Sequence, residues 1–255
     1  MPAQPRPDRQ RGVFETLLVL DGRPVQLDAH IARLDASLET LFPDWPQPSE
    51  LARAIDERAR NVSRGGLRIT AAPVADGEID VTIENAEVEP ERILPAEPHA
   101  IDAHSLVLPG GLGCHKWADR AFLDAEQARL GPDAVSAIFD RDGTLLEASR
   151  ANVFAVMGSA LVTPPADGRI LPGIARACVL EIAADAGLEA REAELCREDL
   201  IGADEVFLTG SLRGVERVRT LDGAELKTGG EATARVAGHL RRAWTGAGLD
   251  RVPRR

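Results

Sequence analysis

The sequence of 255 residues contains no tyrosine, three cysteines and only two lysines. Acidic residues outnumber basic ones by 41 to 30, which gives a formal net charge of −11. This charge argues against binding to nucleic acid or to an anionic membrane, because neutralising phosphate requires clustered Lys and Arg. The three cysteines show no CxxC or His-spaced pattern, so we expect neither a disulfide framework nor a metal site, as is usual in a reducing cytoplasm.

A long apolar segment is also missing. No run approaches the ~20 residues of a membrane-spanning helix, and the first twelve residues contain no hydrophobic signal core. Apolar residues make up 44% of the chain and charged residues 28%, as is typical of ordinary globular proteins. We therefore expect a cytoplasmic protein of one or two domains, without a membrane or nucleic-acid partner.

The scarcity of lysine draws attention to Lys116 and Lys227. Arginine stays protonated in proteins, whereas a lysine amine can lose its proton and attack a carbonyl carbon. Lys116 follows a glycine-rich loop, at residues 109–113, directly ahead of a predicted helix, where functional groups often lie. A partly desolvated amine beside a cation such as His115 would have a lowered pKa suited to Schiff-base formation. The alternative is a solvated lysine at a helix start, and for Lys227, in a polar turn, we expect only solvation.

The predicted elements indicate two mixed α/β lobes. An acidic, proline-containing segment without periodicity, residues 86–100, is the expected linker. We therefore expect a smaller N-terminal α/β domain over residues 1–100 and a larger C-terminal α/β domain over 101–255 that carries Lys116. The expected strands are 13–20, 67–71, 79–84, 105–108, four short antiparallel ones between 135 and 162, 205–208 and 215–221; the expected helices are 28–41, one after 49, 118–130, one from 172 to about 187, and 231–244.

Charged side chains at the ends of predicted elements are further candidates. Glu147 closes a short strand, and a carboxylate buried there would need a cationic or proton-donating partner, such as a protonated pyridine nitrogen. An ion pair with Arg150, or exposure to solvent, is the more common explanation. By helical spacing, Arg33 lies at the edge of a buried helix face, where it would need an anionic partner. A surface ion pair is the alternative for Arg33.

Two other segments suit an anion. The sequence Leu171-Pro-Gly-Ile-Ala opens a helix, so the backbone N–H groups near Ile174 and Ala175 would point toward an anion. The sequence Phe207-Leu-Thr-Gly-Ser places two hydroxyl groups around Gly210, directly after a strand, which also suits an oxyanion. Each signal alone is weak, because most helices that begin with Pro-Gly bind nothing.

Taken in chain order, these segments resemble the fold-type IV pyridoxal-phosphate enzymes. That family includes branched-chain and D-amino-acid aminotransferases and aminodeoxychorismate lyase. The resemblance extends from residue 12 to about 220. The matching segments are Phe14-Glu-Thr, His30-Ile-Ala-Arg-Leu, Lys116 with Arg120, Glu147 with Ala151-Asn-Val-Phe, Leu171-Pro-Gly-Ile, and Glu205-Val-Phe-Leu-Thr-Gly-Ser.

The resemblance implies a role for each matching residue. Lys116 would hold the aldehyde of pyridoxal 5′-phosphate and later move the substrate proton, and Glu147 would keep the pyridine nitrogen protonated. The residues implied for the phosphate are Arg33, the backbone amides of Ile174 and Ala175, and the pair Gly210 and Ser211. The implied fold is two α/β domains with the cofactor between them, usually in a homodimer.

The sequence departs from the family at three places. Arg11-Gly12 precedes the first predicted strand, where the family has a further strand and a Gly-Asp-Gly-like lead. Asp119 stands where asparagine is common. Some family transaminases place a tyrosine near the phenolic oxygen of the cofactor, and since this chain has none, Arg120 would take that place.

The reaction implied by the resemblance is that of the lyase. The greatest likeness, over residues 110–120 and 146–154, is to lyase-like members, so we expect a 4-amino-4-deoxychorismate lyase of folate biosynthesis that releases pyruvate and 4-aminobenzoate. Its small-molecule substrate carries two negative charges, for which Arg213, or alternatively Arg68, is a candidate ligand, although either could be a surface charge. The alternatives are a D-amino-acid or branched-chain aminotransferase, and a non-catalytic member that binds cofactor or a partner.

Overall fold

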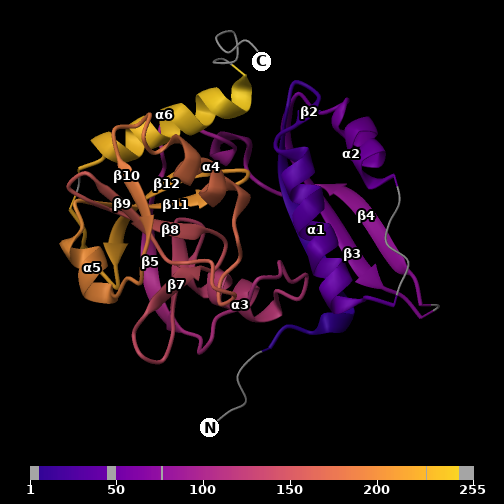
Figure 1. Cartoon of the computed structure of the whole chain (residues 1–255), viewed down its shortest axis with the longest axis horizontal. Coiled ribbons are helices and arrows are strands. Elements are labelled where there is room, and N and C mark those ends of the chain that lie inside the picture. The colour runs from indigo at the N-terminus through magenta and orange to yellow at the C-terminus, as the bar shows by residue number, and fades with distance from the viewer. Residues whose placement is uncertain (1–5, 45–49, 76, 228, 247–255) are drawn as a thin grey trace. The chain divides into compact units, whose positions relative to one another are not determined.

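The computed structural model describes residues 6–44, 50–75, 77–227 and 229–246 (Figure 1). The chain forms two compact units: a first unit of Met1–Ile93 with His115–Phe122, and a second unit of Leu94–Cys114 with Leu123–Arg255. The division thus lies at residue 93, whereas we expected it at 100. Lys116, which we expected in the C-terminal domain, is part of the first unit.

The first unit is an antiparallel sheet with two helices packed against it. In spatial order its strands are β2 (Arg23–Pro24), β1 (Val13–Leu20), β3 (Arg64–Pro73) and β4 (Ile79–Asn85). The helices are α1 (Leu27–Leu41) and α2 (Leu51–Ala59), with 3-10 turns at Arg9–Arg11 and Pro90–Arg92. Alternate residues of β1, such as Leu17 and Val19, share one core with Leu34 and Leu38 of α1, because side chains alternate between the two faces of a strand.

These elements confirm the strands and helices expected for the N-terminal part. Ser49, before the second expected helix, and Asp76, between the strands expected at 67–71 and 79–84, lie outside the described residues. The helix expected at 28–41 begins one residue earlier, with Asp28 in its first turn and Gln26, in a left-handed conformation, as its cap. A carboxylate in the first turn still interacts favourably with the helix dipole.

The second unit contains a nine-stranded mixed sheet. Its strands in spatial order are β10 (Glu189–Glu192), β9 (Ala160–Thr163), β8 (Asn152–Met157), β11 (Glu205–Gly210), β12 (Gly214–Leu221), β5 (Ala100–Val107), β6 (Ala134–Phe139) and β7 (Leu145–Ala148), and β13 (Ala224–Glu225) pairs with β12. The sheet curls, because the edge strand β7 turns directly into β8, and the amide of Ala148 donates to the carbonyl of Ala151 at 2.8 Å.

Lys116, the expected nucleophile, lies in the connection between the parallel strands β5 and β6. Parallel neighbours require a crossover connection, since a tight turn can join only antiparallel strands. This crossover consists of the glycine-rich loop, the segment that holds Lys116, and α3 (Ala121–Leu130). The strand β5 starts at Ala100, so the predicted linker is shorter than 86–100.

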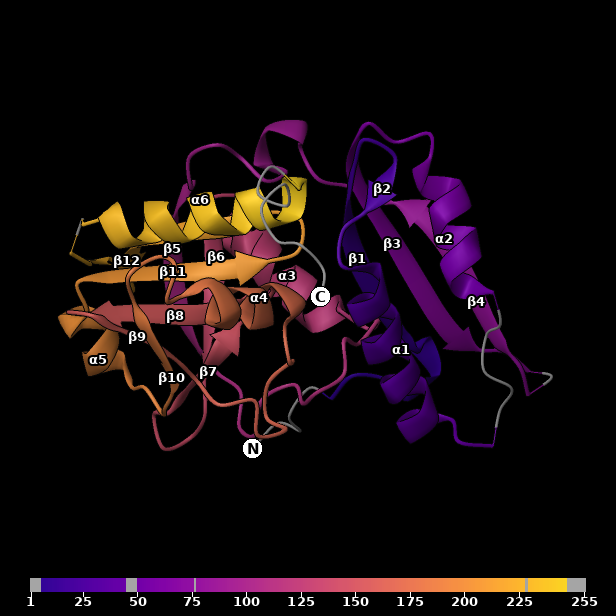
Figure 2. The same ribbon diagram turned by 45° about the horizontal axis from the view of Figure 1, so that its top comes forward.

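Three further helices belong to the second unit: α4 (Ile174–Ile182), α5 (Arg197–Gly202) and α6 (Glu231–Thr245). In both views, α6 runs beside β11 and β12 (Figures 1 and 2). The sequence did not predict β10 or α5, because β10 is fully exposed and polar and α5 is only six residues long. In the described parts of the chain, no helix has the length and apolar character that a membrane span requires.

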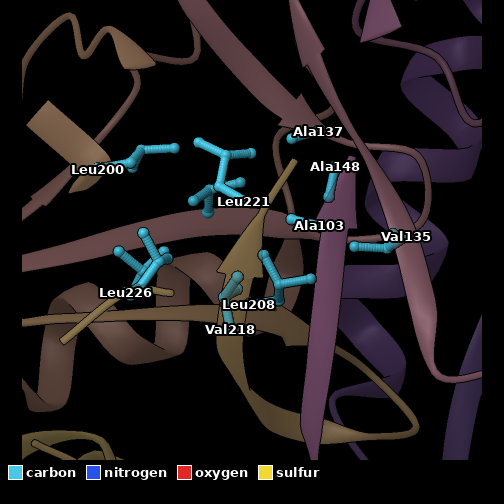
Figure 3. Close-up of a pocket in the computed structure, with 11 residues that line it drawn as sticks. Ala103, Val135, Ala137, Ala148, Leu200, Leu208, Val218, Leu221 and Leu226 are labelled. Carbon is cyan, nitrogen blue, oxygen red and sulfur yellow. The ribbon is translucent and has the colours of Figure 1, made fainter. Parts of the chain in front are cut away.

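Small and branched apolar side chains fill the interior of the curled sheet. Figure 3 shows Ala103, Ala137, Leu208 and Val218, from four strands, directed into one space. A cavity of about 10 Å³ remains there, lined only by apolar residues. A void of this size has room for one water molecule at most and offers no polar partner, so we assign it to core packing and not to ligand binding.

Gly12, directly before β1, occupies a position where no side chain fits. Its φ is 72°, and a Cβ atom would lie 2.0 Å from the carbonyl oxygen of Ala71. We expect Gly12→Ala to lower the free energy of unfolding by more than ~2 kcal/mol, since the clash adds to the ~1–2 kcal/mol of left-handed strain. The matched control is Gly143→Ala, where φ is 87° and nothing lies within 4 Å, so only strain remains. Denaturant titration measures both, and equal losses would contradict this account.

Candidate functional site

Lys116 lies in an extended segment that pairs with the start of β1. The amide of Phe14 donates to the carbonyl oxygen of Lys116 at 2.8 Å, and the amide of Ala118 donates to that of Gly12 at 3.1 Å. Trp117 completes an antiparallel bridge with Val13. The backbone around Lys116 is therefore fixed by sheet hydrogen bonds of the first unit.

Side chains in this segment alternate as in a strand. Trp117 packs against the core of the first unit, and Nδ1 of His115 lies 3.0 Å from Oγ of Ser37 on α1. The side chain of Lys116 therefore lies on the side of the segment opposite to His115 and Trp117. Burial lowers the pKa of His115, so the imidazole is neutral at neutral pH and is not the cationic neighbour that we expected from the sequence.

The cations near Lys116 are two arginines gathered on one aromatic ring. Nζ of Lys116 lies 4.6 Å from the ring centroid of Phe14, Cζ of Arg68 lies 3.8 Å from it, and Cζ of Arg120 lies 6.0 Å from it. The ring is 5% exposed, and its negative face attracts all three cations. The structure thus brings together three residues that the sequence analysis selected separately.

Arg33 is held by a buried acid on the neighbouring strand. Glu15 of β1 is 2% exposed and receives Nε and Nη2 of Arg33 at 2.8 and 2.7 Å, a two-point contact that fixes the guanidinium plane. Nδ1 of His30, also buried, lies 2.7 Å from the same carboxylate. The expected anionic partner of Arg33 is therefore Glu15. The sequence already showed this glutamate in Phe14-Glu-Thr, but periodicity alone does not reveal that it is paired.

The ionisation of this group follows from its contacts. Burial alone would raise the pKa of Glu15, but the hydrogen bonds and charges of His30 and Arg33 outweigh burial and lower it to about 2. Burial and the positive charges of Arg33 and Lys116 together lower the pKa of His30, although the Glu15 carboxylate raises it. At neutral pH the group is therefore a carboxylate between a guanidinium and a neutral imidazole.

Glu147, in β7 of the second unit, is 5% exposed. Its Oε2 accepts the amide of Leu171 at 3.3 Å, which ties the strand to the loop before α4. Arg150, the neighbour that we considered as its ion-pair partner, binds the buried carboxylate of Glu216 through both terminal nitrogens.

The start of α4 leaves backbone amides outside the hydrogen bonds of the helix. Gly173 precedes the helix without a side-chain cap, and the first helical hydrogen bond runs from Ala177 to the Gly173 carbonyl. The amides of Ile174 and Ala175 are therefore not used within the helix. A Cβ atom on Gly173 would lie 1.9 Å from Oδ1 of Asn152, so close packing on β8 explains the glycine.

The turn between β11 and β12 holds the remaining candidates. Gly210 ends β11, and Ser211 begins the turn. Nη1 of Arg213 lies 3.7 Å from the Glu216 carboxylate, so this arginine is part of an ion-pair network with Arg150.

In the described chain, no group of three or more His, Cys, Asp or Glu residues could hold a metal ion. Lys227 is exposed and bonds Asp204 at 3.1 Å, as expected for a surface lysine.

Comparison with known proteins gives four findings. The family model of class IV aminotransferases matches residues 12–221. A branched-chain-amino-acid aminotransferase of Salmonella typhimurium is 36% identical over 118 residues, which is 46% of this chain and only 38% of that protein. An aminodeoxychorismate lyase of Bacillus subtilis is 29% identical over 220 residues, 79% of this chain and 74% of that protein. The structure of a hypothetical aminotransferase from Mycobacterium tuberculosis, in a PLP-bound form, superposes with a TM-score of 0.80 and 26% identity, covering 97% of this chain and 95% of that one.

The Glu15 group predicts an acid-dependent stability. The pKa of Glu15 is about 2 in the folded chain, below an unfolded value of about 4.3, so its contribution is complete above pH ~4.3 and is lost as pH falls toward 2. We expect Glu15→Gln to lower the free energy of unfolding by about 3 kcal/mol at pH 7, because it leaves a buried arginine without its carboxylate.

Urea titrations at several pH values measure this effect. The gap between wild type and Glu15→Gln should narrow toward pH 2, because the wild-type carboxyl is then protonated as well. The matched control is Glu57→Gln, which removes an exposed ion pair with Arg53 and should change stability by less than ~0.5 kcal/mol. A loss that does not depend on pH would show that shape, and not charge, matters at position 15.

Proposed function

The chain belongs to the class IV aminotransferase family, and we propose that within this family it is a 4-amino-4-deoxychorismate lyase. Its cofactor is pyridoxal 5′-phosphate. The observation that carries the lyase proposal is the pair of guanidinium groups, Arg68 and Arg120, beside the Lys116 amine on the Phe14 ring. A substrate with two carboxylates suits a site that contains these guanidinium groups, whereas a branched-chain amino acid offers one carboxylate and an apolar side chain.

The donor set of the chain fits the cofactor. An amine is required for the aldehyde, and Lys116 would provide it. Glu147, a buried carboxylate, would hold the protonated pyridine nitrogen, and Arg120 would lie near the phenolic oxygen. The uncapped start of α4, with the amides of Ile174 and Ala175, suits the phosphate. The other phosphate ligands in this proposal are Arg33, Gly210 and Ser211.

Lys116 would also be the base. When bound, the cofactor supplies an electron-accepting ring for the charge that remains after proton loss. The Lys116 amine takes the proton from the substrate ring carbon that bears the amino group, and the bond between the ring and the enolpyruvyl oxygen then breaks. The leaving enolpyruvate takes up a proton to become pyruvate, and the ring becomes the aromatic 4-aminobenzoate. The neighbouring guanidinium groups would favour the unprotonated amine that this step requires.

Arg68 and Arg213 are the candidates for the substrate carboxylates. Arg68 is the better of the two in this proposal, because it shares the Phe14 ring with Lys116, whereas Arg213 is engaged with Glu216. We also propose a homodimer acting in the cytoplasm, as is usual for this family; size-exclusion chromatography with light scattering tests the dimer.

The second candidate is an aminotransferase, favoured by the 36% identity to a branched-chain enzyme over nearly half of the chain. Incubation of the holoenzyme with 4-amino-4-deoxychorismate, without any keto acid, separates the two. Repeated release of pyruvate supports the lyase. Arrest after one equivalent, with formation of pyridoxamine phosphate, supports the aminotransferase, and a protein that binds cofactor without turnover is a non-catalytic member.

The two lysines provide a matched pair of variants. We expect Lys116→Ala to abolish the visible absorption band of the holoenzyme, because the variant lacks the amine proposed to form the Schiff base. Lys227→Ala should retain the full band, because its amine is engaged on the surface with Gly202 and Asp204. Absorbance spectra of the two variants after addition of cofactor measure this, and a band that survives in Lys116→Ala would contradict the assignment.

Removing one guanidinium tests the substrate charge. We expect Arg68→Met to lower kcat/KM for the lyase substrate about ten- to hundred-fold, the range of a hydrogen bond between charged groups, while the cofactor band is unchanged. Arg58→Met, which removes an exposed arginine of the same unit, is the control and should have no effect. Steady-state kinetics of pyruvate release measure kcat/KM for both variants. Equal values would argue against binding of a substrate carboxylate by Arg68.

A further inference from the structure

One buried hydroxyl of the second unit is unsatisfied. Thr209, the next-to-last residue of β11, is 2% exposed, and its Oγ1 has no hydrogen-bond partner among the described residues. A buried polar atom without a partner destabilises a fold, so such atoms in native proteins call for an explanation. Two other buried threonines of this unit follow the rule: Oγ1 of Thr163 donates to the Val153 carbonyl at 2.8 Å, and Oγ1 of Thr233 donates to Glu205 at 2.6 Å.

Strand register places this hydroxyl beside the start of α4. Thr209 stands directly opposite Asn152 of β8, and residues opposite each other in an antiparallel pair share a face, with Cβ atoms about 5 Å apart. Asn152 in turn contacts the loop before α4, where its Nδ2 donates to the Leu171 carbonyl at 3.0 Å and its Oδ1 lies against Gly173. Thr209 therefore lies on the sheet face that carries the helix N-terminus.

Gly173 and the first two residues of α4 carry no side-chain donor. Gly173 supplies no cap, and the second helical residue, Ala175, has only a methyl group. The backbone amides there carry partial positive charge but contribute no hydroxyl. The unsatisfied hydroxyl of Thr209 and the uncapped helix are independent observations, and both are explained by one bound anion.

We propose that the Thr209 hydroxyl donates a hydrogen bond to a phosphate monoester bound at the N-terminus of α4. On the proposed function, this anion is the phosphate of pyridoxal 5′-phosphate, and Thr209 is a cofactor-binding residue in addition to Gly210 and Ser211. In the absence of ligand the hydroxyl is a destabilising feature of the fold, and the anion satisfies it. Loss of the hydroxyl should therefore affect stability and binding in opposite directions.

The test uses Thr209→Val, which keeps the shape of the side chain and removes the hydroxyl. We expect its cofactor-free form to be at least as stable as wild type, while its affinity for pyridoxal 5′-phosphate and for inorganic phosphate falls about tenfold. Its affinity for pyridoxal, which lacks the phosphate, should be unchanged. Thr209→Ser should restore phosphate affinity. Thr163→Val is the matched control, and it should lose stability but keep its phosphate affinity, because that hydroxyl is already paired.

Absorbance titration and urea unfolding of the same preparations give every readout. The inference is overturned if Thr209→Val binds the phosphate compounds as wild type does, if pyridoxal binding weakens equally, or if the cofactor-free variant is destabilised as Thr163→Val is. Failure of the wild-type protein to bind pyridoxal 5′-phosphate would overturn the proposed function. If that protein nevertheless bound inorganic phosphate in a Thr209-dependent way, the hydroxyl would still be an anion ligand.

Discussion

The pairing of residues 116–118 with the start of β1 is the constraint on which the proposed chemistry depends. Two backbone hydrogen bonds fix the segment, and strand alternation then sends Lys116 to the side where Phe14 lies, while Trp117 is packed into the core. Since β5 and β6 are parallel, a crossover connection must join them, and in this chain part of that connection, with Lys116, belongs to the first unit. The backbone that carries the flexible Lys116 side chain is thus fixed by backbone hydrogen bonds alone.

Charge in the first unit is organised around one strand. Phe14 of β1 contacts Lys116 and two arginines, and its neighbour Glu15 fixes Arg33. The buried carboxylate offsets the desolvation of its guanidinium partner, which would otherwise be prohibitive in this position. In the second unit, the buried carboxylate of Glu216 likewise forms ion pairs with Arg150 and Arg213.

The sequence predicted much of this arrangement, and the failures have physical reasons. Regular apolar spacing correctly identified α1, and strand-like apolar segments identified β1 and the strands between 135 and 162. The polar strand β10 carried no such signal, and the unit boundary was misplaced because Lys116 joins the first unit through long-range pairing that local sequence does not encode. The rarity of lysine drew attention to Lys116, whose role stays a prediction. Its neighbour His115 was misjudged, because burial, which lowers its pKa, depends on the tertiary fold.

The central claim is that Lys116, fixed by β1, is the amine that bonds covalently to pyridoxal 5′-phosphate. The most direct measurement is reduction of the holoenzyme with borohydride, followed by proteolysis and mass spectrometry of the peptides. The account predicts a single pyridoxyl group on the peptide that contains Lys116. A label on Lys227, or no labelled lysine in a protein that holds the cofactor, would contradict it.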